Sequence, residues 1–362
     1  MIIRIFLVFN KKLQMKKVFL FFTVSFFLFA LFGCQFNGNS FLFSKDQVKN
    51  EIENLKQEIS PINNVKVSSR VPRLLDGLMV ELGQENKLPV AVVFDNFPGA
   101  PRPTLASASI VYEMPVEGGL TRFLAIFDQA NLPEAAGPIR SARPYSAEVA
   151  EEYKSLYTHA GGSPDALFKL KQKFYKVINL DEISWQGKYF WRDPSQSAPH
   201  NLYIKKEGLI NFLDENKIFN QADFSGWYYG AGIRLSDQEA ENIKINFSPI
   251  AESNWQYNEG QKKYQYLQNN KNYRDKNNQE ILVDNIIIQY APITILDEIG
   301  RRQIKLTGQG EALIFQQGKV VKGKWIKEAG RTKFYNQAGE EIIFISGKTW
   351  VSVVSLTNQV DY

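Results

Sequence analysis

The stretch Pro89-Val-Ala-Val-Val-Phe94 is an uninterrupted apolar run, and three similar runs follow it at Ala108–Tyr112, Arg122–Phe127 and Ser155–Ala160. Polar turns rich in glycine and proline separate these runs. Continuous apolar strands of this kind are typical of a sheet that is buried on both faces. The four runs therefore predict the central strands of a covered sheet.

Helical windows lie between and after the later runs, at Ser146–Tyr153, Pro164–Tyr175 and Lys205–Asn216. The second window begins at Ser163-Pro164-Asp165, which provides a serine N-cap, a proline at the first helical position and an acid in the first turn. Strands that alternate with helices indicate an α/β fold. We predict an α/β domain with a mixed sheet over residues 73–232.

The sequence pattern changes after Ser236, where short predicted strands are separated by turns that contain glycine. In Ile243, Ile245 and Phe247 apolar residues alternate with polar ones. The later predicted strands are Ile281–Tyr290, Gln303–Leu306, Ala312–Phe315, Val320–Trp325, Thr332–Tyr335, Glu341–Ile345 and Trp350–Val354. This pattern predicts a smaller, mostly antiparallel β domain over residues 233–362, joined to the first domain near Phe224–Gly232.

The N-terminal segment has the pattern of an export signal. Lys16 and Lys17 precede an apolar stretch of about fifteen residues, which suits a signal peptide and is shorter than a membrane-spanning helix. Leu31-Phe-Gly-Cys34 then resembles a lipobox and contains the chain's only cysteine. We predict a lipoprotein signal peptide over 1–33, lipidation of Cys34, and a tether over 34–72 that carries an amphipathic helix at Lys45–Ile59. The alternative for Cys34 is a buried core thiol.

The charge balance argues against one class of partner. The chain has 43 Lys and Arg against 38 Asp and Glu, and five of the basic residues precede Cys34, where there is no acid. Subtracting these five leaves 38 against 38, so a mature protein that begins at Cys34 has no overall attraction for nucleic acid. No cysteine remains for a disulfide, and the 44% of hydrophobic residues must supply a packed core.

Four segments rich in polar residues and tight turns lie near the ends of the predicted strands and contain both histidines of the chain. Loops at such ends can bring polar groups together over a rigid scaffold. The segments are Glu113–Arg122, Gly137–Tyr145, Tyr157–Ser163 and Trp191–Tyr203. They predict a ligand site in the α/β half.

Structural alternatives exist for several of these residues. His159 follows an apolar run and is equally compatible with a buried, hydrogen-bonded histidine. Arg140 and Arg143 could pair with a structural carboxylate such as Glu117, and Ser163 could be only a helix cap. Glu113 is either a strand-end charge or a functional acid. Outside these segments, Trp325 and Trp350 are either core aromatics or a carbohydrate platform.

Several motifs resemble those of the YerB-like lipoproteins, a family of unknown function from Gram-positive and related bacteria. The resemblance extends from about Leu88 to the C-terminus and implies a separate C-terminal domain. It rests on Asp95-Asn96, Ile110–Glu113, Val116–Gly119, Thr121–Ala125, Gly137–Pro144, His159–Ser163, Ala198–Tyr203, Gly310–Leu313, Gly323–Trp325 and Gly347–Trp350. The sequence departs from the family pattern at Phe97, where a histidine is common, and at Ser109, where an acid is common. The family supplies no activity.

Two hypotheses about function follow. In the first, an extracytoplasmic, lipid-anchored protein binds an anionic envelope molecule or polymer, because arginine meets phosphate or carboxylate oxygens bidentately. Arg122, Arg140 and Arg143 would hold the anion and Ser141, Ser163 and Asn201 would orient it; Asp95, Asn96 and Arg192 complete the candidate ligand-binding set.

In the second hypothesis the same cleft is that of a transferase or hydrolase. His159 or His200 would act as general acid or base with Glu113 or Glu117, and the arginines would stabilise developing charge. No cofactor is predicted. No metal is predicted either, because two histidines about forty residues apart form a poor zinc signature, although a metal held by both histidines and acids stays an alternative. The protein partner is open.

Overall fold

The computed structural model describes Asn50 and residues 69–232, 238–268 and 271–362. The chain divides into two compact units, Met1–Val67 and Ser68–Tyr362, and the fold below is that of the second unit. The predicted signal peptide and Cys34 lie outside the described residues. The predicted tether helix also lies outside them, except for Asn50. Within the described residues, no helix has the length and apolar character needed to cross a membrane.

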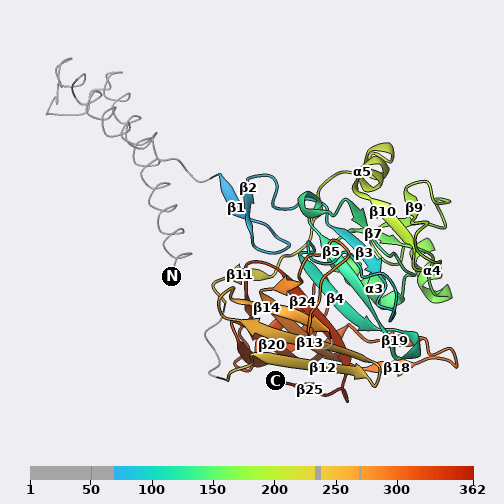
Figure 1. Ribbon diagram of the computed structural model, residues 1–362. Coiled ribbons are helices and arrows are strands. Elements are labelled where there is room, and N and C mark those ends of the chain that lie inside the picture. The colour runs from blue at the N-terminus through green and yellow to red at the C-terminus, as the bar shows by residue number, and fades with distance from the viewer. Residues whose placement is uncertain (1–49, 51–68, 233–237, 269–270) are drawn as a thin grey trace. The chain divides into compact units, whose positions relative to one another are not determined.

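A mixed sheet of ten strands is the largest element of this unit (Figure 1). Five strands come from residues 90–181 and five from residues 285–355. The order is β22 (Lys333–Asn336), β21 (Lys319–Lys327), β20 (Gly308–Gln316), β17 (Asn285–Ala291), β24 (Thr349–Ser355), β4 (Ile110–Pro115), β5 (Thr121–Phe127), β3 (Val90–Phe94), β7 (Leu156–His159) and β8 (Ile178–Asp181). The late strand β24 lies between β17 and β4 and is parallel to both.

The apolar runs form the centre of the first half of this sheet. All five residues of β3 are buried, and so are all six of β4. β5 pairs antiparallel with both β3 and β4, whereas β3 and β7 are parallel. The prediction of a mixed sheet with strands covered on both faces is therefore confirmed.

Helices α3 (Pro144–Glu152), α4 (Pro164–Lys171) and α5 (Lys206–Glu215) accompany this half. α4 begins as expected, with Ser163 accepting a hydrogen bond from the Ala166 amide and Pro164 in the first turn. α3 packs beside the sheet, where the hydroxyl of Tyr153, just beyond the helix, is 2.9 Å from that of Tyr112 on β4. One face of β4 is thus covered from the helical side.

A second sheet is antiparallel and covers the opposite face. Its strands are β15 (Lys271–Asn272), β14 (Lys263–Gln268), β13 (Ala251–Asn258), β12 (Asn242–Ser248) and β25 (Val360–Asp361), with β16 (Leu282–Val283) paired to β14. Trp255 and Tyr266 of this sheet pack against Trp350 of β24, with ring centroids 5.0 and 5.4 Å apart. Trp350 pairs with Val111, and side chains alternate along a strand, so these rings lie on the other side of the sheet from Tyr112.

Four small sheets and two 3-10 turns complete the described unit. The sheets are β1 (Arg70–Pro72) with β2 (Met79–Glu81); β6 (Ala135–Ala136), β10 (Leu202–Lys205) and β9 (Phe190–Arg192); β11 (Tyr228–Gly230) with β23 (Ile343–Ile345); and β18 (Ile293–Ile295) with β19 (Arg302–Ile304). The 3-10 turns are Glu117–Gly119 and Gln129–Asn131.

The later strands form mostly antiparallel pairs, as predicted; the parallel pairs are those of β24 with β17 and β4 and that of β23 with β11. The division at residue 232 stays a prediction, and the ten-stranded sheet runs across it. No strand was predicted between Phe247 and Ile281, where β13, β14 and β15 lie. In β13 and β14 aromatic residues alternate with glutamines, which is a strand pattern. Trp325 and Trp350 are both fully buried, as core aromatics are.

Candidate functional site

β5 directs two neighbouring side chains to opposite faces of the large sheet. Thr121 pairs with Pro115, and Arg122 pairs with Met114 on the neighbouring strand β4. Because side chains alternate across a strand, Thr121 points toward the antiparallel sheet and Arg122 toward α3. The predicted site residues are therefore divided between two faces.

The α3 face holds a group of arginines. Arg143, at the N-terminus of α3, donates from Nε and Nη2 to the two carboxylate oxygens of Glu117, each at 2.7 Å. Burial disfavours the charged form of Glu117, but the hydrogen bonds and charge of Arg143 hold its pKa below the ordinary value. This bidentate pair is the structural alternative that the sequence left open for Arg143.

Arg122 lies beside this pair without a carboxylate of its own among the described residues. Its Nη1 donates to the carbonyl oxygen of Ser141 at 3.3 Å. Burial, together with the charges of Arg143 and Arg140, lowers the pKa of Arg122 to about 10. A cavity of about 10 Å³ borders Arg122, Ser141 and Arg143, which is about the space of one water.

The sequence analysis missed one arginine of this group, Arg302. It lies on β19, which packs against α3, and its Nε donates to the carbonyl oxygen of Val116 at 2.7 Å. The charge of Arg302 reaches the buried ring of Tyr145, as do the charges of Arg122 and Arg143. No pattern around Arg301-Arg302 signals this position, because the packing of β19 against α3 joins segments far apart in the chain.

Asp95 and His200 form a second pair next to the arginines. The buried carboxylate of Asp95 accepts a short hydrogen bond from Nδ1 of His200, and Nε of Arg140 lies 3.3 Å from the same oxygen. Nη1 of Arg140 also donates to the Pro199 carbonyl oxygen at 3.3 Å. The ring of Phe97 stacks on the imidazole with centroids 5.0 Å apart. His200 stays partly exposed, with 21% of its side chain accessible.

The structure separates His159 from this group. Its side chain is fully buried, Nδ1 lies 2.7 Å from the Gly161 carbonyl oxygen, and Nε2 lies 2.7 Å from Oδ1 of Asn179. Both ring nitrogens are thus engaged inside the protein. This is the environment of the buried, hydrogen-bonded histidine that the sequence left as an alternative.

Three other candidate residues hold local structure. Ser163 is 8% exposed and caps α4. Arg192 bridges the side chains of Asn201 and Glu182 at 3.2 and 3.3 Å. Asn201 in turn donates to two backbone carbonyls of the preceding loop. Among the described residues, none of these three side chains forms a hydrogen bond or ion pair with the side chain of Arg122, Arg140, Arg143 or Arg302.

Glu113 lies on the opposite face, beneath the antiparallel sheet. It is 1% exposed and accepts hydrogen bonds from the hydroxyls of Thr121 at 2.9 Å and Ser253 at 2.6 Å. Burial raises the pKa of Glu113 to about 7, although the two hydroxyls act to lower it. Thr121 also accepts from the amide of Asn96 at 2.7 Å. Glu113 is thus a buried acid and not the surface charge at a strand end that the sequence left as one alternative.

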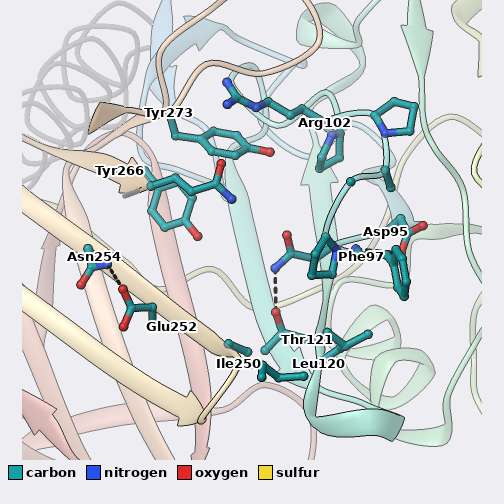
Figure 2. Close-up of a pocket in the computed structure, with 18 of the residues that line it drawn as sticks. Asp95, Phe97, Arg102, Leu120, Thr121, Ile250, Glu252, Asn254, Tyr266 and Tyr273 are labelled. Atoms are coloured by element: carbon teal, nitrogen blue, oxygen red, sulfur yellow. Dashed lines mark hydrogen bonds between the residues drawn. The ribbon is translucent and has the colours of Figure 1, made fainter. Parts of the chain in front are cut away.

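A pocket of about 470 Å³ opens above this chain of hydrogen bonds (Figure 2). Asn96, Phe97 and Thr121 line one side of it. β13 and β14, with the segment after them, supply Glu252, Asn254, Tyr266 and Tyr273. The sequence analysis missed this second wall because it missed β13 and β14; the alternating aromatic residues Trp255, Tyr257, Tyr264 and Tyr266 were the available signal.

Among the described residues, no group of three or more His, Cys, Asp or Glu side chains could hold a metal ion. Asp95 with His200 supplies two such groups, and the third neighbour of this pair is a guanidinium.

Comparisons with known proteins agree on one group of relatives. A family described as "Protein of unknown function (DUF3048) N-terminal domain" matches residues 75–219, and its C-terminal domain matches residues 243–351. A Bacillus subtilis (strain 168) protein named "Putative lipoprotein YerB" is 30% identical over 285 residues, which are 77% of this chain and 85% of that protein. The crystal structure of YerB from Bacillus subtilis matches with a TM-score of 0.72 and 28% identity, over 81% of this chain and 100% of that chain.

Proposed function

Because this chain belongs to the YerB-like family, whose N- and C-terminal domains both match it, we propose that it is a lipid-anchored envelope protein that binds an anionic ligand at its arginine group. The arginine group is defined as Arg122, Arg140, Arg143 and Arg302. The family is of unknown function, so the proposal rests on the chemistry of these side chains.

The anchor is supported by the signal pattern that ends at Cys34 and by the name of the Bacillus relative. An acylated Cys34 would attach the chain to the outer face of the cytoplasmic membrane. The folded unit would then act close to the membrane surface.

The observation that carries the ligand proposal is the charge imbalance around Arg122. Four guanidinium groups face two carboxylates, Glu117 and Asp95, and those carboxylates pair with Arg143 and Arg140. Arg122 keeps one hydrogen bond to a carbonyl oxygen, at 3.3 Å. A charge that is largely out of water and without a counterion is unfavourable, and an anion bound there removes this cost.

Arginine also suits the geometry of a phosphate or carboxylate, since its planar donors meet two oxygens at once. Ser141 and the partly exposed His200 lie at the edges of the group and would add neutral or protonated donors. Arg143 is positioned by its two hydrogen bonds to Glu117.

The test is a thermal titration with inorganic pyrophosphate, using sodium chloride at equal ionic strength as the reference. We expect the melting temperature to rise with pyrophosphate concentration, because ligand bound only to the folded state stabilises it. Arg122→Gln should remove this rise, and Arg70→Gln, which changes an exposed arginine paired with Glu81, should preserve it. A rise that survives Arg122→Gln contradicts the proposal.

A second candidate function is catalysis at His200. The favouring observation is that Asp95, buried and paired with Arg140, fixes Nδ1 of an imidazole that is partly exposed to solvent. An acid that orients a histidine in this way is the arrangement of a general base. In this alternative the arginine group would stabilise charge that develops on a substrate.

A further inference from the structure

The pocket of about 470 Å³ above Thr121 is distinct from the arginine group, although Asp95 borders both. It lies on the other face of β5, and its volume is within the range of small-molecule sites. Figure 2 shows the rings of Tyr266 and Tyr273 on one side of the pocket and Phe97 on the other, with Thr121 between them at the base. Its two walls come from the two regions that match the two family domains.

The carboxylates at this pocket, Asp95 and Glu252, are already paired with cations or with His200. Arg102 donates to the Arg274 carbonyl oxygen at 2.9 Å, and its guanidinium lies 4.7 Å from the centre of the Tyr273 ring. Glu252 forms an ion pair with Lys244 at 2.9 Å and accepts from Asn254 at 2.9 Å. The described lining therefore presents no unpaired carboxylate, and its cation Arg102, which has no carboxylate partner among the described residues, lies over the Tyr273 ring.

Neutral polar groups are held in fixed positions instead. The amide of Asn96 donates to Thr121, whose own proton goes to Glu113. Because the Asn96 NH₂ group points to Thr121, the amide oxygen of Asn96 points away from Thr121 and can act as a hydrogen-bond acceptor. Asn254 uses its NH₂ group on Glu252 and likewise keeps a carbonyl oxygen. Side-chain amides offer both donors and acceptors, as does the Tyr273 hydroxyl.

Glu113, buried beneath the pocket, accepts hydrogen bonds from residues of both walls, Thr121 and Ser253. Ser253 of β13 donates to its second carboxylate oxygen at 2.6 Å, and the Ser253 hydroxyl lies 3.3 Å from that of Tyr266. A single buried carboxylate thus orders hydroxyls on both sides of the pocket. Side chains that are ordered before binding lower the entropy cost of binding a ligand.

We propose that this pocket binds a neutral, hydroxyl-rich ligand, namely a saccharide unit of one to two rings. Hydroxyl groups of such a ligand match the fixed amide and hydroxyl groups of Asn96, Asn254 and Tyr273, since each can donate and accept. The apolar face of a sugar ring matches the aromatic side chains that line the pocket. Asn96, Thr121 and Tyr273 are the residues that determine binding.

The test uses the disaccharide of N-acetylglucosamine and the full-length protein in detergent. Saturation-transfer NMR and calorimetric titration should both show saturable binding. Asn96→Ala and Tyr273→Phe should each weaken the affinity roughly tenfold, the loss expected for one hydrogen bond. Asn220→Ala, a matched change at an exposed position far along the sequence from the pocket residues, should leave the affinity unchanged.

Three outcomes would overturn the proposal: no saturable binding to the wild-type protein, binding that keeps its affinity in both pocket variants, or loss of binding in Arg122→Gln. The last result would place the sugar at the arginine group. Circular dichroism of each variant verifies that it is folded. Pyrophosphate stabilisation is measured on the same preparations, so failure of the saccharide site is distinguished from failure of the anion site.

Discussion

The two faces of β5 show how differently a protein can treat polar side chains only one residue apart. On the α3 face, Arg122 lies among other guanidinium groups and has one carbonyl oxygen as its hydrogen-bond partner. On the other face, Thr121 takes part in a continuous chain from Asn96 to Glu113 to Ser253. The first face is electrostatically incomplete and the second is internally satisfied. We therefore propose a charged ligand for the first face and a neutral one for the second.

The loop after β3 connects the two faces. Asp95 turns its carboxylate to His200 and Arg140, and the next residue, Asn96, turns its amide to Thr121. A ligand that displaces this loop at one site would be felt at the other. The following changes separate the two faces.

The largest effect is expected from Glu113→Gln in the pH dependence of stability. The pKa of Glu113 is raised from 4.5 to about 7 in the folded protein, so the folded state binds this proton more tightly than the unfolded chain does. The stability that this protonation contributes is fully present below pH 4.5 and is lost as the pH rises through about 7. At about 1.4 kcal/mol for each unit by which the pKa is raised, the loss in the free energy of unfolding is about 3 kcal/mol. Urea unfolding of wild-type protein and variant between pH 4 and 8 measures the difference. A constant difference across this range would show that Glu113 titrates normally.

An intermediate effect is expected from a pair of changes on the α3 face. Glu117→Gln removes the bidentate partner of Arg143 and leaves a second uncompensated charge beside Arg122, which should destabilise the protein by about 2 kcal/mol. Arg122→Gln removes the uncompensated charge and should stabilise the ligand-free protein by about 1 kcal/mol. The free energy of unfolding in urea, measured without added anions, should fall in Glu117→Gln and rise in Arg122→Gln. Such opposite changes support the charge imbalance. Destabilisation by both changes would indicate that Arg122 has a favourable structural role.

The smallest effect on stability is expected from His200→Gln, which tests the catalytic alternative. Asp95 keeps Arg140 as a partner, so the loss should be about 1 kcal/mol, the value of one hydrogen bond. If His200 is a general base, the variant should fail to restore the envelope phenotype of a deletion strain at normal protein levels. Full complementation would exclude catalysis by His200 and leave the binding function.

Much of the local structure could be predicted from the sequence. The apolar runs at β3, β4, β5 and β7 and the cap of α4 depend on residues close together in the chain. The candidate segments were identified for the same reason, since turns and strand ends have local signatures. The roles within those segments were not predictable: Arg143 could be free or paired, and His159 could be exposed or buried, until the contacts of each were known.

The sequence by itself determined the strands of the first half, the start of α4 and the family, because these follow from short-range backbone preferences and ordered motifs. Only the tertiary structure decided that β24 lies beside β4, that His200 meets Asp95 across 105 residues, and that β13 and β14 complete a pocket. Such contacts join distant segments, and their free energy depends on burying whole faces together. No window of neighbouring residues contains that information.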